Sequence, residues 1–131
     1  MLFFLAKRKG VKDWFTGLSI SEKSVGRSHA LQFHHIFPKA LLRDLDIDRR
    51  NINDISNLAF INGKTNRSIS NKKPENYLED ILQKRGGQAL ISQHIPLDKA
   101  EWELSNFLQF LDDRRVKLTD EINECIRELS S

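Results

Sequence analysis

The chain has 131 residues, of which 39% are apolar and 30% charged, with a formal net charge of +3. This length suits a single domain with a modest core, and the composition is that of an ordinary globular protein. The single cysteine, Cys125, excludes an internal disulfide and a cysteine-based zinc cluster, which fits a reducing cytoplasm, and the apolar start MLFFLA is too short to span a membrane.

The charge is unevenly distributed along the chain. Residues 27–73 contain nine Lys or Arg and four Asp, whereas residues 74–131 contain seven basic and twelve acidic residues. A basic middle next to an acidic end predicts a localised anion-binding surface with a polyphosphate as its partner. Taken alone, the same charges fit an ordinary solvated surface equally well.

The first part of the chain predicts a helix, a strand and a second helix. Residues 2–9 read as a helix that Gly10 ends. Residues 30–37 (ALQFHHIF) contain aromatic and branched side chains and stop at Pro38, which indicates a strand. Residues 38–45 (PKALLRDL) then place the proline at a suitable first helical position and favour a helix.

The middle of the chain predicts a second strand and a short helix. Residues 46–56 read as a loop with one helical turn, and residues 57–61 (NLAFI) read as a short strand. The pair Asn62-Gly63 turns the chain. Residues 64–71 (KTNRSISN) then read as a short helix.

The last part of the chain is expected to be helical. The predicted helices are 74–85, opened by Pro74 and followed by Gly86, then 87–95, and then 98–129, as one long helix or as two broken near Ser105. Asp98 with Glu101 three residues later matches a capping box. The apolar positions recur at helical spacing, so we expect these helices to pack, with Tyr77, Trp102 and Cys125 in the core.

Two of the four histidines, His34 and His35, are adjacent at the end of the first predicted strand. They could be a packed pair, a metal site, or a metal ligand beside a general base. Asn57 starts the second strand, and Asn66 follows nine residues later on the short helix. A strand pair packed against one helix can bring these places to a single point, although no local spacing would do so.

The segments HHIFP, NLAFI and KTNRSISN resemble the HNH nucleases, also called the ββα-metal or His-Me finger family. The closer match is to the HNH domain at the C-terminal end of GmrSD-type restriction proteins. The motif covers residues 31–78, and the flanking KDWFTGLSI and IPLD extend the likeness over most of the chain. Such proteins carry a ParB-like nucleotide-hydrolase domain upstream, so the resemblance implies that partner, which lies outside these residues.

The resemblance implies a role for each motif residue. His34 matches the position that binds a divalent metal, and His35 matches the general base that activates water. Asn57 matches the asparagine whose side chain braces the connection and fixes the orientation of the histidine. Asn66 matches the final metal-ligand position. A neutral imidazole suits the base, because it can take a proton from water near pH 7.

The implied substrate is DNA, and the implied cofactor is a divalent metal ion. Lys64, Arg67, Lys72 and Lys73 could hold flanking phosphates. We expect Mg²⁺ at the metal site. Mn²⁺, Ni²⁺ and Zn²⁺ are alternatives, because both proposed ligands are neutral, whereas Mg²⁺ prefers carboxylate oxygen. Asp54 is close enough in sequence to be considered as a further ligand.

Adjacent strand residues point to opposite faces, so His34 and His35 can serve one site only if the strand twists sharply or ends between them. The expected fold is α+β, a small ββα-metal centre embedded in a mostly helical single domain. Its parts are a lead-in at residues 1–30, the motif at 31–78 and a helical part at 79–131. The expected function is a metal-dependent HNH endonuclease domain of a restriction or phage-defence protein. An inactive nucleic-acid-binding module and a helical interaction domain are the alternatives.

Overall fold

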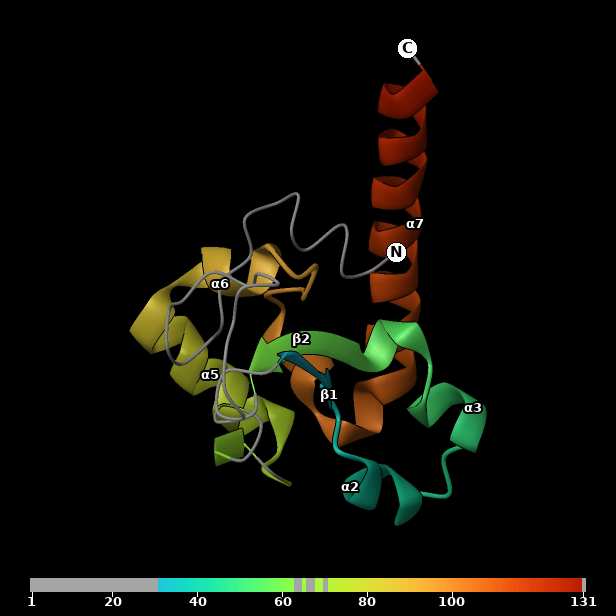
Figure 1. Cartoon of the computed structure of the whole chain (residues 1–131). Coiled ribbons are helices and arrows are strands. Elements are labelled where there is room, and N and C mark those ends of the chain that lie inside the picture. Colours follow the sequence, from blue (N-terminus) through green and yellow to red (C-terminus); the bar gives the residue numbers. More distant parts are fainter. Residues whose placement is uncertain (1–30, 63–64, 66–67, 70, 131) are drawn as a thin grey trace.

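The structure is a computed structural model that describes residues 31–62, 65, 68–69 and 71–130. Within these ranges the fold is α+β, as predicted, with two antiparallel strands set among helices (Figure 1). The helix expected at residues 2–9 lies outside the described residues. Most of the helix expected at 64–71 does too, although Thr65, Ser68 and Ile69 are helical.

The two strands form the centre of the fold. Strand β1 (Leu31–His35) pairs antiparallel with β2 (Leu58–Asn62), in a register that places His34 opposite Ala59. His34 therefore shares a face of the sheet with Ala59, which is fully buried in the core. Because side chains alternate, His35 lies on the other face.

The connection between the strands contains three short helical elements. These are α2 (Lys39–Arg43), α3 (Arg49–Ile52) and the 3-10 helix η1 (Ile55–Asn57). Pro38 precedes α2 directly, and the side chains of Asp48 and Asp54 cap the next two elements by accepting from backbone N–H groups two residues later, each at 2.9 Å. The predicted helical turn within residues 46–56 is thus confirmed as α3.

Helices α5 (Pro74–Arg85) and α6 (Gly87–Ile91) follow β2 and pack together. Pro74 occupies the first turn of α5, where its missing N–H costs nothing, and Gly86 ends the helix with φ +83°. The predicted boundaries of this helix are confirmed. Its buried face consists of Tyr77, Leu78 and Ile81.

The region from Asp98 onward differs from a continuous helix. It contains the 3-10 helices η2 (Lys99–Trp102) and η3 (Leu104–Asn106), followed by the long helix α7 (Phe107–Ser130). The extended backbone of Glu103, with ψ 142°, separates η2 from η3, so the predicted break near Ser105 is present. Asp98 caps η2 through the N–H of Ala100 at 3.1 Å, but Glu101 does not complete a capping box and lies against Asp113 instead.

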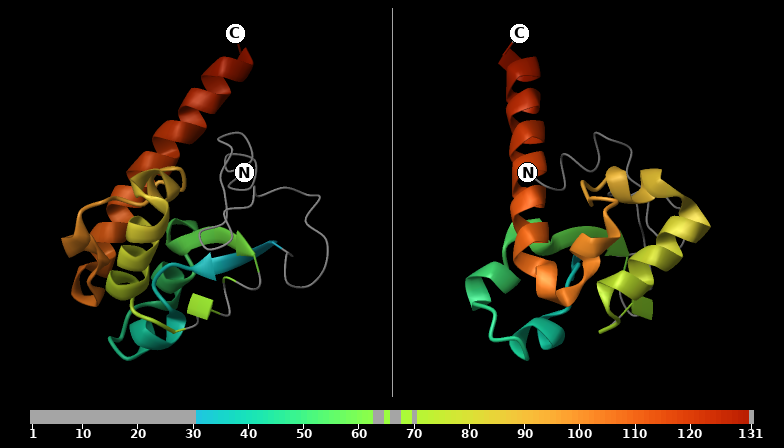
Figure 2. Two further views of the ribbon diagram at one scale, coloured as in Figure 1. Left: turned by 90° about the vertical axis from the view of Figure 1, so that its left-hand side faces the viewer. Right: turned by 180° about the vertical axis from the view of Figure 1, so that it is seen from behind.

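The first half of α7 packs behind the strands, and its second half extends beyond the other described elements (Figures 1 and 2). The ring of Phe37 packs at a tilt against those of Phe107 and Phe110 of α7, with ring centroids 5.1 and 4.9 Å apart. Trp102 is fully buried and Cys125 nearly so, as expected. Among the helices that the structure describes, none is long and apolar enough to cross a membrane.

Candidate active site on strand β1

His34 is held in the interior by Tyr77. Its side chain is 3% exposed, and its Nε2 lies 3.2 Å from the Tyr77 hydroxyl of helix α5. The two rings meet edge to face, with centroids 5.6 Å apart and an interplanar angle of 73°. The contact joins residues 43 positions apart in the sequence, so it is a product of the tertiary fold.

The hydroxyl of Tyr77 also fixes which nitrogen of His34 carries a proton. Burial raises the pKa of Tyr77 well above its ordinary value, against a smaller opposing effect of Arg114, so the hydroxyl keeps its proton. That proton is donated to the backbone oxygen of Ile36. The hydroxyl oxygen must then accept from Nε2–H of His34, which places the lone pair of the neutral ring on Nδ1. This is the tautomer that a ligand histidine with a supporting hydrogen bond adopts.

His35 lies on the opposite face of β1 and has a different partner. Its Nε2 lies 3.1 Å from Oδ1 of Asn53, which can only accept, so Nε2 carries the proton and Nδ1 the lone pair of the neutral ring. Partial burial lowers the pKa of His35, the hydrogen bond to Asn53 opposes this, and the nearby Lys39 charge lowers it further. The ring is therefore neutral near pH 7, as a base requires.

The two histidines do not meet at one point through their described contacts. Strand β1 continues through His35, so it does not end between the rings, and the expected convergence is not seen in the residues that are described. His34 contacts α5, and His35 contacts Asn53 at the end of α3. Asp54, considered above as a ligand, instead pairs with Arg115 at 2.9 Å and caps η1.

Asn57 braces the backbone that follows the histidines. It is fully buried, and its Oδ1 accepts from Phe37 N–H at 2.8 Å. Its Nδ2 donates to the oxygens of Phe37 at 3.1 Å and Ile52 at 2.9 Å. The backbone oxygen of Asn57 also accepts from Ile36 N–H at 2.8 Å. Asn57 thus ties the backbone that follows β1 to the end of α3.

The segment that carries Asn57 is held by Arg114 of α7. This side chain is fully buried and donates to the backbone oxygens of Ile55 at 3.2 Å and Ser56 at 2.8 Å. It also donates twice to the backbone oxygen of Gln93, at 3.2 and 3.0 Å. Burial lowers the pKa of Arg114 to about 9, which leaves it charged near pH 7.

Gln93 links Arg114 to the edge of β2 that does not pair with β1. Its Oε1 accepts from Phe60 N–H at 2.9 Å, and its Nε2 donates to the Phe60 oxygen at 3.0 Å. The amide therefore takes the place of a third strand at that residue and satisfies both backbone groups. Arg114 of α7 therefore holds Gln93, and Gln93 holds β2 along the edge that does not pair with β1.

Three contacts around the candidate site were missed by sequence reasoning: those of Asn53, Tyr77 and Arg114. Arg114 had a detectable signal, since it follows Phe107, Phe110 and Leu111 at the spacing of the buried face. A charged residue in such a stripe indicates a buried polar contact. Asn53 had no comparable signal, because its partner His35 lies 18 residues away.

Several predicted site residues cannot be placed. Asn66, Lys64 and Arg67 lie outside the described residues, whereas Lys72 and Lys73 are exposed just before α5. Within the part of the chain that is described, no group of three or more His, Cys, Asp or Glu side chains could hold a metal ion. His34 is the one proposed ligand that can be tested for fit there, and its Nδ1 lone pair is of the required kind.

The strand pair thus has a histidine at the end of β1 and a buried asparagine directly before β2. The family model of the GmrSD restriction endonucleases, C-terminal domain, matches residues 6–121. The chain therefore belongs to this family of restriction-endonuclease modules, and the resemblance found in the sequence is confirmed.

A short match to one curated protein adds to this comparison. An uncharacterized protein of Methanocaldococcus jannaschii is 36% identical over 55 residues, which is 42% of this chain. The chain spans only 10% of that protein's length. No solved structure matches the chain.

Proposed function

We propose that the chain is a metal-dependent HNH endonuclease domain that hydrolyses DNA phosphodiester bonds. It would be a module of a cytoplasmic restriction or phage-defence protein that acts with an upstream ParB-like domain. The observation that carries the proposal is the brace formed by Asn57 on both backbone groups of Phe37, two residues after His35. Family membership supports it independently.

In this proposal His35 is the general base. Its neutral ring takes a proton from a water molecule whose oxygen attacks phosphorus, while the bond to the 3′ oxygen breaks. Asn53 holds the ring through Nε2, which leaves Nδ1 as the nitrogen that receives the proton. Asn57 keeps the backbone after His35 from shifting. The ring of His35 would therefore already be in position before the substrate binds.

The divalent metal would be held by His34 and Asn66. Because His34 and His35 lie on opposite faces of β1, the bound phosphate would have to reach both faces at the end of the strand, which is His35 itself. Tyr77 orients the ring of His34 and places the lone pair of the neutral ring on Nδ1, the atom that would bind the ion. When bound, the ion would neutralise the phosphate and stabilise the leaving oxygen. Mg²⁺ is proposed first, and Mn²⁺, Ni²⁺ or Zn²⁺ suit the imidazole equally or better. Lys64, Arg67, Lys72 and Lys73 would contact flanking phosphates.

Plasmid nicking tests the proposal directly. Supercoiled plasmid is incubated with the chain and Mg²⁺, Mn²⁺, Ni²⁺ or Zn²⁺, and nicked circles are measured on a gel. We expect metal-dependent nicking that His35→Ala reduces by at least about 10²-fold. His94→Asn is the matched control, because it removes another histidine of the described chain, at a positive φ that asparagine tolerates. Equal rates in the two variants would contradict the role of His35.

The second candidate function is an inactive nucleic-acid-binding module. The observation that favours it is the neutral ligand set, since His34 brings no carboxylate and the described residues contain no acidic metal cluster. The measurement that separates the two is duplex binding by fluorescence anisotropy in EDTA, run beside the nicking assay. Binding without nicking under any of the four metals would favour this module over the nuclease.

A further inference from the structure

A hollow of about 450 Å³ lies between α2 and α3. Figure 1 shows these two short helices next to each other at one end of the described structure. Its lining residues are Lys39, Arg43, Ile47, Arg49, Ile52 and Asn53. The apolar side chains of Ile47 and Ile52 belong to or pack against the core, whereas the other four residues are exposed. The hollow therefore has an apolar base and a polar, mostly cationic rim.

The charges on this rim are available to a ligand. No ion pair found among the described residues includes Lys39, Arg43 or Arg49. Asp44 and Asp46 lie on the same connection but do not line the hollow. Three cations that face one hollow repel one another, so an anion that binds there gains from all three at once.

Asn53 connects the hollow to the candidate base. Its side chain lines the hollow, and its Oδ1 accepts from Nε2 of His35 at 3.1 Å. Lys39 also lines the hollow. Asn53 therefore lies between the hollow and the Nε2 side of the His35 ring.

We propose that this hollow binds one backbone phosphate of the nucleic acid, next to the phosphate on which His35 acts. The proposal rests on the proposed function and adds contacts from Lys39, Arg43, Arg49 and the amide of Asn53. Arginine donates through a planar fork that fits phosphate oxygens in pairs. Ile47 and Ile52 offer an apolar surface to the attached sugar, which a lone inorganic anion would leave unused.

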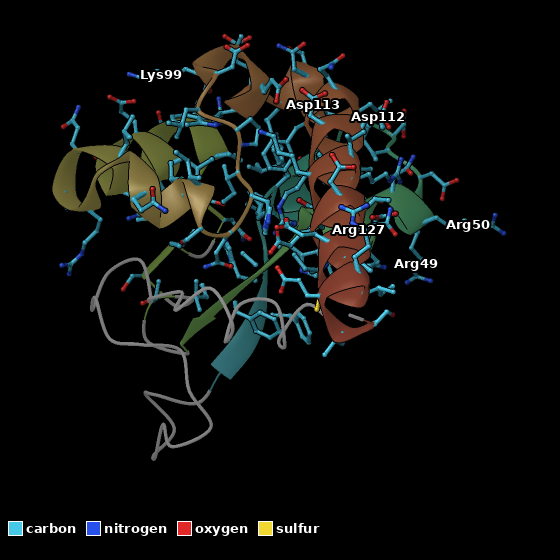
Figure 3. All side chains as sticks on the ribbon, turned by 90° about the horizontal axis from the view of Figure 1, so that it is seen from above. Arg49, Arg50, Lys99, Asp112, Asp113 and Arg127 are labelled. Atoms are coloured by element: carbon cyan, nitrogen blue, oxygen red, sulfur yellow. The ribbon has the colours of Figure 1, made fainter. Side chains whose placement is uncertain are left out.

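Duplex binding in EDTA tests the proposal in the whole chain. We expect the double variant Arg43→Ala/Arg49→Ala to weaken binding about tenfold and to reduce the slope of log K against log salt by about 1. The matched control is Arg50→Ala/Arg127→Ala, which removes the same charge from α3 and α7 outside the hollow; Figure 3 shows these exposed side chains. Equal losses in the two double variants would overturn the proposal, since general charge would then explain both.

Titration with inorganic phosphate separates this site from the nuclease itself. In NMR spectra of the metal-free chain we expect phosphate to shift the Nε–H signals of Arg43 and Arg49 and the side-chain amide of Asn53, but not Nε–H of Arg50. Equal shifts at Arg49 and Arg50 would overturn the anion site. Phosphate shifts without duplex binding would overturn nucleic acid as the occupant. If the chain does not nick plasmid but shows both the expected duplex binding and the expected phosphate shifts, the nuclease proposal fails and the anion site stands.

Discussion

Asn57 shows why an asparagine is needed directly before the second strand. One planar amide must accept from Phe37 N–H and donate to two backbone oxygens, those of Phe37 and Ile52. Aspartate lacks the donor and would bury a charge, and alanine lacks both functions. The side chain of Asn57 thus supplies the hydrogen bonds that a neighbouring strand would otherwise give to the backbone of Phe37.

Replacing Asn57 is expected to destabilise the domain strongly. Asn57→Ala leaves three buried backbone groups without partners, so we expect a loss of about 2–4 kcal/mol in the free energy of unfolding. Urea denaturation measures it. Asn76→Ala on the exposed side of α5 is the control and should change stability by less than about 0.5 kcal/mol. A loss below about 1 kcal/mol for Asn57→Ala would contradict the bracing role.

Tyr77 provides a second prediction at this scale. Tyr77→Phe keeps the ring but removes the hydroxyl between His34 and the oxygen of Ile36. We expect a stability loss of about 1–2 kcal/mol and, because the tautomer of His34 is no longer fixed, a metal affinity about 10–100-fold weaker. Isothermal titration with Mn²⁺ measures the second effect. Unchanged affinity would mean that His34 does not bind the metal through Nδ1.

At the scale of elements, the sequence marks helix ends better than it marks contacts. Pro74 and Gly86 bound α5 as predicted, because each restricts the backbone locally. The 3-10 geometry of η2 and η3 was not predicted, since it depends on how Trp102 packs and donates to the Pro96 oxygen. The faces of His34 and His35 followed from strand alternation, but their partners lie 43 and 18 residues away and leave no local pattern.

The contact between η2 and α7 predicts a pH dependence of stability. Burial raises the pKa of Glu101 to about 7, with further contributions from the hydrogen bond and charge of Asp113 and from the charge of Asp98; Lys117 opposes them. Figure 3 shows Asp113 on α7. A carboxyl whose pKa is raised by folding stabilises the fold fully below its unfolded value of 4.5, and this stabilisation is lost as pH rises through about 7.

We therefore expect the melting temperature of the wild type to fall between pH 5 and pH 8, relative to Glu101→Gln. The amide cannot ionise, so the variant should be the more stable of the two at pH 8, and the difference should shrink toward pH 5. Thermal unfolding followed by circular dichroism measures this. Glu103→Gln, on the exposed neighbour, is the control. Parallel curves for wild type and Glu101→Gln would contradict the raised pKa.

At the scale of the whole molecule, Arg114 joins three separate parts of the chain. From α7 it reaches η1 through Ile55 and Ser56, and it reaches the segment after α6 through Gln93. Arg115, its neighbour, adds an ion pair to Asp54 at the start of η1. The carbonyl dipoles compensate the buried charge, so α7 serves as the support on which the bracing segment rests.

Arg114→Met tests whether this support reaches the candidate site. Methionine fills part of the volume but donates no hydrogen bond, so three backbone oxygens lose their partner, and we expect a loss of about 3–5 kcal/mol in stability. Arg127→Met, exposed on the same helix, should change stability by less than about 0.5 kcal/mol. Hydrogen exchange then locates the effect. The amide of Phe37, which Asn57 holds, should exchange faster by more than the global loss explains, because η1 is released before the rest of the domain unfolds. If Phe37 exchanges only in step with the buried amides of α5, Arg114 stabilises the molecule as a whole and does not position Asn57.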